Sequence, residues 1–286
     1  SIPCDRFARM DLAALERRLK QGGVGTVVAT LGTTAVGSVD PLAEIQALRE
    51  RYGFRLHADC AYGGYFTLAS DLAPSARAAF DRIDEVDSIV IDPHKHGLQP
   101  YGCGCVLFRD PAVGKLYRHD SPYTYFTSGD LHLGEISLEC SRPGAAAVAL
   151  WATQRLLPLV PGAEFAGMLT DCRKAALALY ERLAADSRFS VAFPPELDIV
   201  VWAVKAENGA RSSQLAREIF AESARRGLHL ALAELPARFF WPEDQALRTG
   251  ATVVSLRSVV MKPPPAGWLD RFLEIMGGAH TAAGAC

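Results

Sequence analysis

The sequence predicts an α/β protein with a mainly parallel sheet in the first half of the chain and a smaller α+β domain in the second. The first half alternates strand-like and helix-like segments, which is typical of parallel strands joined by covering helices. Around residues 158–162 the pattern changes to a long alanine-rich stretch followed by a different order of strands and helices. We therefore expect two domains, over residues 1–157 and 158–286.

Four strands are expected in the first domain, over residues 26–32, 54–59, 88–92 and 105–109. The first of them is β-branched and has no polar alternation, as in strands that are buried on both faces. Two helices should start at caps, one at Asp11 and one at Asp40, which precedes a favourable first-turn proline. With a third helical stretch around residues 74–83, helices should cover both faces of this sheet.

The second domain is expected to mix helices with strands. A long helix should occupy residues 164–185 and a buried strand residues 198–204. The remaining segments are a helix near 212–226, strands around 228–235 and 252–261, and a closing helix over 268–276.

The composition excludes several classes of protein. The chain has 286 residues, 49% of them hydrophobic, and a net charge of −2, which gives no electrostatic reason to bind nucleic acid or an anionic membrane. No apolar run approaches the roughly 20 residues of a membrane span, and no signal-peptide pattern opens the sequence. Seven scattered cysteines do not indicate a disulfide framework. We expect a cytoplasmic protein.

Unusual polar residues stand at the ends of three predicted strands: Thr34, His57, Asp59, Asp92, His94 and Lys95. In parallel α/β sheets, ligands bind outside the carboxyl ends of the strands. A lysine and a carboxylate at that edge either neutralise each other or serve one bound molecule that has both a basic nitrogen and an aldehyde. No third ligand accompanies the two histidines around Lys95, so no metal site is expected.

Four stretches in order favour the bound molecule: "ATLGTTAVGSVDPL", "LHADCAYGG", "DPHKHG" and "ECSRPGAAA". Through them, residues 1–155 resemble the pyridoxal-phosphate enzymes of the aspartate-aminotransferase superfold (fold type I), and among these the group II amino-acid decarboxylases. The C-terminal part matches more loosely. The resemblance implies pyridoxal 5′-phosphate as the cofactor. It also implies that residues 1–157 are the C-terminal part of the large cofactor-binding domain.

The resemblance also implies a role for each residue that matches the family's motifs. Lys95 forms the Schiff base with the cofactor aldehyde, after its amine loses a proton, which burial favours. Asp59 keeps the pyridine nitrogen protonated, so that the ring accepts electrons from the broken bond. Ala61 lies against the ring face, Thr34 contacts the ring side near Asp59, and His57 lies near the substrate or the ring.

Further roles follow from the same resemblance. Asp92 and His94 face the phosphate side of the cofactor. The polar and aromatic stretch 119–134 indicates a long loop, and such loops often act as lids. In the family a tyrosine of this loop protonates the intermediate as a general acid. Tyr123 and Tyr125 are both candidates, and their spacing does not choose between them.

The same residues also have ordinary structural explanations. Lys95 would then be an exposed turn residue, Asp59 a cap for the turn that follows it, and Thr34 a turn former. His57 would be a hydrogen-bonded core histidine. The two loop tyrosines would pack at a subunit interface.

Family members carry an additional large N-terminal segment, which includes the turn around the phosphate and the residue stacked on the ring. This chain starts at a point after both. A sheet that lacks its early strands exposes unpaired edges and apolar surface. We therefore expect a complementary N-terminal segment or chain as partner, and a homodimer or heteromer, because sites in this family form across a subunit boundary.

The predicted function is pyridoxal-phosphate-dependent decarboxylation of an L-amino acid, with this chain supplying part of the site and inactive alone. The substrate stays open among aromatic amino acids, glutamate or aspartate, and diaminobutyrate. Because the cofactor labilises any of three bonds at the α-carbon, the alternatives are another carbon-carbon or carbon-sulfur lyase or an aminotransferase. A non-catalytic subunit or fragment is the alternative from a different class.

Overall fold

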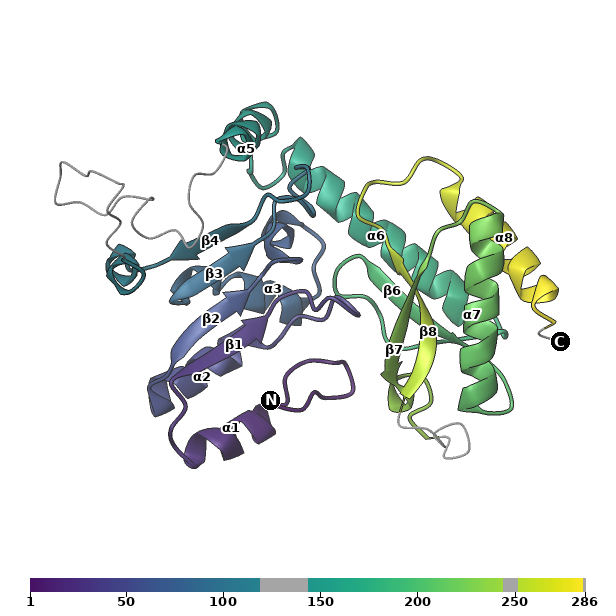
Figure 1. Ribbon diagram of the computed structural model, residues 1–286, viewed down its shortest axis with the longest axis horizontal. Coiled ribbons are helices and arrows are strands. Elements are labelled where there is room, and N and C mark those ends of the chain that lie inside the picture. The colour runs from purple at the N-terminus through teal and green to yellow at the C-terminus, as the bar shows by residue number, and fades with distance from the viewer. Residues whose placement is uncertain (119–143, 244–251, 285–286) are drawn as a thin grey trace.

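The first of two sheets carries the predicted strand ends. The structure, a computed structural model, describes residues 1–118, 144–243 and 252–284. The first sheet has the order β1-β2-β3-β4 (Figure 1), with bounds Thr26–Thr30, Arg55–Asp59, Ser88–Ile91 and Cys105–Phe108. β1, β2 and β3 are parallel, and β4 runs antiparallel to β3. The predicted mainly parallel sheet is confirmed.

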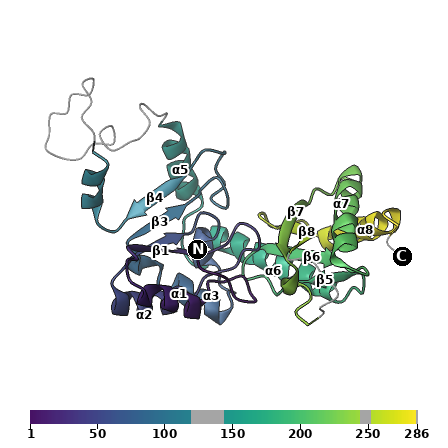
Figure 2. The ribbon, with the colours of Figure 1, turned by 60° about the horizontal axis from the view of Figure 1, so that its bottom comes forward.

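Three helices accompany the first sheet: α1 (Leu12–Lys20), α2 (Leu42–Tyr52) and α3 (Pro74–Phe80). Short 3-10 turns over Gly64–Leu68, Ile83–Glu85 and Pro111–Leu116 link the elements. Figure 2 shows α1, α2 and α3 on the same side of the sheet. The expectation of helices on both faces is therefore wrong for the described residues, in which one face stays open.

The two predicted caps had different outcomes. Asp11 caps α1 as expected, since its Oδ1 accepts a hydrogen bond from the Ala14 amide at 2.9 Å. Asp40 does not cap α2. Its carboxylate instead accepts hydrogen bonds from the amides of Met10 at 2.7 Å and Thr30 at 2.8 Å. These two bonds connect the N-terminal segment to β1.

The strand register defines the uncovered surface, which we call the open face. One row across the sheet is Val28, His57, Ser88 and Phe108, and the next is Thr30, Asp59, Val90 and Val106. Val28 is 49% exposed and Val106 is 53% exposed. The prediction that residues 26–32 are buried on both faces is wrong in this chain, because no described helix packs on the open face.

The second sheet is antiparallel and has the order β5-β6-β8-β7. Its strands are β5 (Phe189–Val191), β6 (Ile199–Val204), β7 (Ala231–Pro236) and β8 (Thr252–Val259). The helices of this half are α6 (Glu164–Ala184), α7 (Gly209–Arg225) and α8 (Trp268–Ala282). They bury one core with β6 and β8, centred on the fully buried Trp202. The expected mixture of helices and strands is confirmed.

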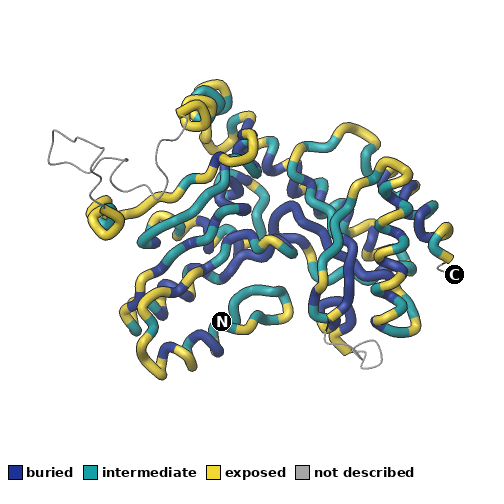
Figure 3. The backbone as a smooth tube through the Cα atoms, viewed as in Figure 1, coloured by how far each residue is buried: buried dark blue, intermediate teal, exposed yellow. Residues whose placement is uncertain are grey.

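Helix α6 joins the two halves of the molecule. Phe165 and Leu169 near its start pack in the core of the first sheet, whereas Leu179 and Leu183 pack in the core of the second. Figure 3 shows buried segments continuing from one sheet to the other where they meet. The two halves therefore share a buried contact.

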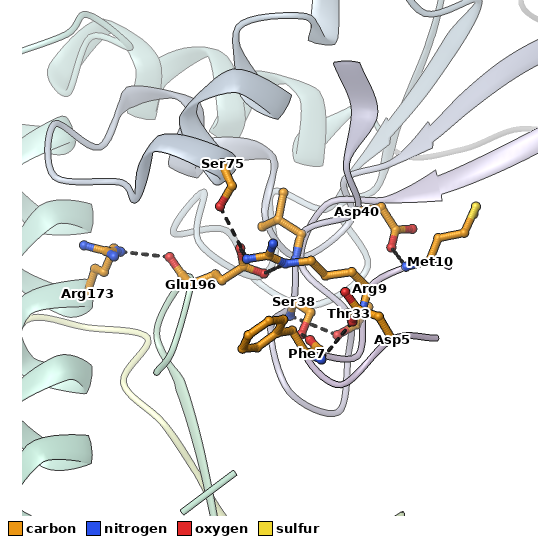
Figure 4. A network of polar contacts seen from close by, with 11 residues as sticks. Asp5, Phe7, Arg9, Met10, Thr33, Ser38, Asp40, Ser75, Arg173 and Glu196 are labelled. Atoms are coloured by element: carbon orange, nitrogen blue, oxygen red, sulfur yellow. Dashed lines mark hydrogen bonds and ion pairs between the residues drawn. The ribbon is translucent and has the colours of Figure 1, made fainter. Parts of the chain in front are cut away.

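Glu196 is the centre of a polar network between the halves (Figure 4). Its carboxylate is 7% exposed and accepts from the Arg9 guanidinium at 2.5 Å and from the Val39 amide at 2.8 Å. Its backbone carbonyl accepts from Arg173 Nε of α6 at 2.8 Å. This network holds the N-terminal segment and the loop 31–40 against the second half. Because Thr34 lies on that loop, the network also positions one of the predicted site residues.

Candidate active site

Three strand ends meet at one edge of the first sheet. The register pairs Thr30 at the end of β1 with Asp59 at the end of β2, and Asp59 with Val90 of β3. The amide of Asp92 then bonds to the carbonyl of Ala61 at 3.2 Å. The predicted site residues that follow these strands are thus gathered by parallel pairing, as the sequence indicated.

These loops can approach closely because glycine stands where they touch. A Cβ atom at Gly63 would lie 2.1 Å from the carbonyl oxygen of Leu31, inside any allowed contact. A Cβ at Gly97 would lie 2.5 Å from the hydroxyl of Tyr65. The absence of side chains at these two positions lets the ends of β1, β2 and β3 close on one another.

Lys95 reaches the edge of the sheet as predicted, but it is less buried than expected. Its side chain is 29% exposed, and its Nζ lies 2.9 Å from Oδ2 of Asp92. The turn is held from within, since the Lys95 amide donates to the Asp92 carbonyl at 2.9 Å. Asp92 thus faces the ammonium of its own turn.

Asp59 and Ala61 lie at the neighbouring strand end. Oδ1 of Asp59 accepts the Ala61 amide at 3.1 Å. Within the described residues the Asp59 carboxylate has no other hydrogen-bond partner and no cation, although it is half-buried. A half-buried carboxylate without a cation suits a ligand that brings a positively charged nitrogen.

Two of the predicted histidines stand close to Asp59 and Lys95 in the sequence. His57 lies on the open face, and its Nδ1 is 2.7 Å from the hydroxyl of Ser88. His94 Nδ1 donates to the carbonyl of Cys103 at 2.6 Å, because a carbonyl oxygen only accepts. Its Nε2 is 3.7 Å from Asp92 Oδ2, beyond hydrogen-bond distance. Both rings are therefore oriented by contacts within the first sheet and its turns.

Thr34 is held by Arg257, a residue that no motif in the sequence marks. Arg257 Nη2 donates to the Thr34 carbonyl at 2.6 Å, and its Nε donates to the Ala35 carbonyl at 2.9 Å. Burial lowers the pKa of Arg257 below its ordinary value, although nearby acidic groups oppose this change. Only the tertiary structure brings this arginine of β8 to the site, because a single arginine in a strand carries no sequence signal.

Residues Tyr123 and Tyr125 lie outside the described residues, so their roles stay predictions. Across the part of the chain that the structure describes, no group of three or more histidine, cysteine or acidic side chains has a metal-binding arrangement. In the same residues, no helix is both long enough and apolar enough to cross a membrane.

Fold and site together define an α/β protein in which the predicted site residues lie at the carboxyl ends of a mainly parallel sheet. The model of the pyridoxal-dependent decarboxylase conserved domain matches residues 1–205. The chain belongs to this family, as its four motifs predicted, and pyridoxal phosphate is the cofactor associated with it.

Curated relatives are amino-acid decarboxylases of greater length. The L-tyrosine decarboxylase of Enterococcus faecium is 30% identical over an alignment of 258 residues, and the match covers 73% of this chain and 42% of that protein. The L-2,4-diaminobutyrate decarboxylase of Acinetobacter baumannii is 34% identical over 180 residues, which is 60% of this chain and 34% of that protein. The chain thus spans less than half of either relative.

Solved structures confirm the fold class. Mouse CSAD in apo form has a TM-score of 0.78 at 22% identity and is covered to 58% by 99% of this chain. Oryza sativa TDC with PLP and tryptamine has a TM-score of 0.80 at 20% identity and is covered to 57%, again by 99% of this chain. Nearly the whole chain therefore takes the fold of these larger proteins.

Proposed function

We propose that this chain supplies the lysine and the ring-binding carboxylate of a pyridoxal-phosphate-dependent L-amino-acid decarboxylase. The observation that carries the proposal is the arrangement of two charges at neighbouring strand ends. Lys95 lies against a carboxylate of its own turn, and Asp59 has no cation among the described residues. Pyridoxal phosphate has an aldehyde for the first and a basic ring nitrogen for the second, and when bound it supplies an electron sink.

The chain's own residues then have distinct tasks. Lys95 would hold pyridoxal phosphate through its aldehyde, and Asp92 would hold the lysine side chain in place. Asp59 would stabilise a proton on the ring nitrogen by its negative charge. We assign His57, Thr34, Ala61 and His94 to the lining of the same site. In the overall reaction the substrate loses its carboxylate as carbon dioxide and takes one proton at the α-carbon.

The proton donor belongs to the same proposal. A neutral tyrosine near the α-carbon suits this step as a general acid, and Tyr123 and Tyr125 are the candidates. Replacing each by phenylalanine separates them. The donor's variant should still release carbon dioxide but return the proton much more slowly, whereas the other variant should behave as the parent protein.

A complementary N-terminal segment or chain is also proposed. The open face presents Val28, Val106 and Phe108 at 38–53% exposure, and β1 forms an edge of the sheet. A groove of about 630 Å³ runs beside β1 and is lined in part by Thr26 and Met10. An unpaired strand edge beside exposed apolar side chains favours the addition of further strands. A homodimer or heteromer built on that unit is part of this proposal.

The test is covalent labelling of the purified chain. Pyridoxal phosphate is added, the visible spectrum is recorded, and the bond is fixed with borohydride before peptide mapping. We expect the label on Lys95 and none in Lys95→Ala, either with the chain alone or after the N-terminal segment of a family member is supplied as a second chain. Labelling elsewhere, or none in both settings, would contradict the proposal.

The substrate and the bond that breaks need a separate measurement. The relatives are named for tyrosine and diaminobutyrate, so these amino acids, with aspartate, glutamate and tryptophan, form the first panel. Carbon dioxide and the corresponding amine are expected from one of them. Formation of an oxo acid instead would favour an aminotransferase.

A further inference from the structure

His96, the residue after Lys95, is buried between the two halves of the chain. Its side chain and that of Asp198, which directly precedes β6, are both 0% exposed. His96 Nε2 is 2.8 Å from Asp198 Oδ2, and His96 Nδ1 is 3.0 Å from the carbonyl oxygen of Tyr62. The hydroxyl of Tyr62 donates to Asp198 Oδ1 at 2.5 Å. We call these three residues the His96 cluster.

The donors and acceptors of this cluster match one another. A carbonyl oxygen only accepts, so His96 Nδ1 carries a hydrogen. Nε2 and the carboxylate oxygen are also at hydrogen-bond distance, so one proton lies between them. Tyr62 keeps its own proton, because burial and the Asp198 charge raise the pKa of its hydroxyl. His96 and Asp198 are thus joined by one buried hydrogen bond, and the Tyr62 hydroxyl gives Asp198 a second.

Aromatic rings surround the histidine of this pair. The His96 ring contacts the rings of Tyr62 and Phe66 edge to face, with centroids 4.7 and 4.9 Å away. Asp198 accepts a hydrogen bond from the Tyr62 hydroxyl and also interacts with the charge of Arg257. Because the side chains of His96 and Asp198 are both fully buried, removing either one costs more than breaking an exposed pair would. The cluster is therefore a firm anchor between His96 and the second half of the chain.

The anchor acts on the lysine through a rigid turn. The Gln99 amide donates to the Pro93 carbonyl at 3.1 Å, and a Cβ at Gly97 would lie 2.7 Å from Pro93 Cα. Such close packing leaves the backbone of residues 93–97 little freedom. His96 points inward to Asp198, and Lys95, one peptide away, points to the sheet edge. The direction of one side chain thus constrains the other.

We propose that His96 is a positioning residue: through its buried hydrogen bond to Asp198, it ties the turn 92–97 to the second half of the chain and fixes the direction of the Lys95 amine. The positioning role rests on the proposed function only because that function gives Lys95 a reaction to perform. It adds a physical link between the second domain and the reacting lysine, across the 102 residues that separate His96 from Asp198.

The hydrogen bond is tested by nitrogen NMR on the whole chain labelled with ¹⁵N-histidine. His96→Gln assigns the His96 signals by their loss. We expect the Nε2 signal of His96 to shift in Asp198→Asn, because the partner atom of this nitrogen changes. An unchanged Nε2 signal in Asp198→Asn would overturn the proposal.

The positioning is tested by the acetylation rate of Lys95, measured by mass spectrometry relative to the exposed Lys20 in the same sample. A charge-assisted hydrogen bond is about twice as strong as a neutral one, so we expect the relative rate to rise about threefold in Asp198→Asn and further in Asp198→Ala. Asp71→Asn is the matched control. It weakens the ion pair between Asp71 and Arg173 of α6, which does not touch the turn 92–97. The control should leave the relative rate unchanged.

Two outcomes decide the proposal. An unchanged His96 Nε2 signal in Asp198→Asn would overturn it, and so would an unchanged Lys95 rate in a chain where that signal has shifted. If Asp198→Ala does not fold, Asp198→Asn decides alone. These measurements use no cofactor. Failure of pyridoxal phosphate to label Lys95 would therefore count against the proposed function and leave the anchor standing.

Discussion

The Asp92 carboxylate lies 2.9 Å from the Nζ of Lys95, three residues further along the same turn. Both side chains are partly exposed, at 19% and 29%. An ion pair in such a position contributes little to stability, because water screens the charges and the side chains lose freedom. The pair is therefore better explained as preparation of the lysine than as a device that stabilises the turn.

A double-mutant cycle with Asp92→Asn and Lys95→Gln tests this explanation. We expect a coupling of about 0.5 kcal/mol in the free energy of unfolding, measured with urea, that falls as salt is raised. A coupling above about 2 kcal/mol that resists salt would instead show that Lys95 is a structural turn residue.

The network around Glu196 should contribute more than the Lys95 pair. Glu196→Gln removes the charge that faces Arg9 and leaves at most one acceptor oxygen for Arg9 and the Val39 amide. Because the group is buried, we expect a loss of about 1–3 kcal/mol in the free energy of unfolding. The matched control is Glu274→Gln, whose partner Arg271 is exposed, and which should cost less than about 0.5 kcal/mol. Equal costs for the two variants would contradict the structure.

The close approach of the strand ends gives a steric prediction. Gly63→Ala places a methyl group 2.1 Å from the Leu31 carbonyl oxygen, and the backbone must move. We expect a loss of about 3 kcal/mol or more in the free energy of unfolding, measured with urea. Gly25→Ala is the control, since nothing lies within 4 Å of its added Cβ. It should stay within about 0.5 kcal/mol of the parent chain.

His280 of α8 gives a pH prediction with a definite sign. Burial and the Arg188 charge lower its pKa below the ordinary 6.5, while Asp186 opposes them. Below pH 6.5 the unfolded chain therefore binds more protons at this residue than the folded one, so stability falls as pH falls. We expect His280→Gln to lose less stability than the parent between about pH 7.5 and 5.5, measured by urea unfolding. His229→Gln, at an exposed position, should follow the parent curve, and three parallel curves would refute the prediction.

Local signals in the sequence located most elements because their causes are local. Apolar runs placed β1, β2 and β3 within a few residues, and the Asp11 cap placed the start of α1. Asp40 carries the same local signal as Asp11, yet it bonds to Met10 and Thr30, because a buried carboxylate takes the strongest donors that the tertiary structure offers. Helix α5 (Ala145–Leu156) was missed, because no side-chain cap marks its start although the segment opens with an apolar run. None of its residues is buried in the described part of the chain.

The sequence by itself determined the family, the mainly parallel sheet and the strand ends that hold Lys95 and Asp59. These follow from residue order, because parallel pairing brings successive strand ends to one edge. Only the tertiary structure decided that Asp92 faces Lys95, that Arg257 holds the Thr34 loop, and that His96 turns inward to Asp198. Arg257 and Thr34 lie more than 100 residues apart in the sequence, and so do His96 and Asp198. Which polar groups meet over such separations depends on how two packed cores come together, and no periodicity or cap along the chain records that.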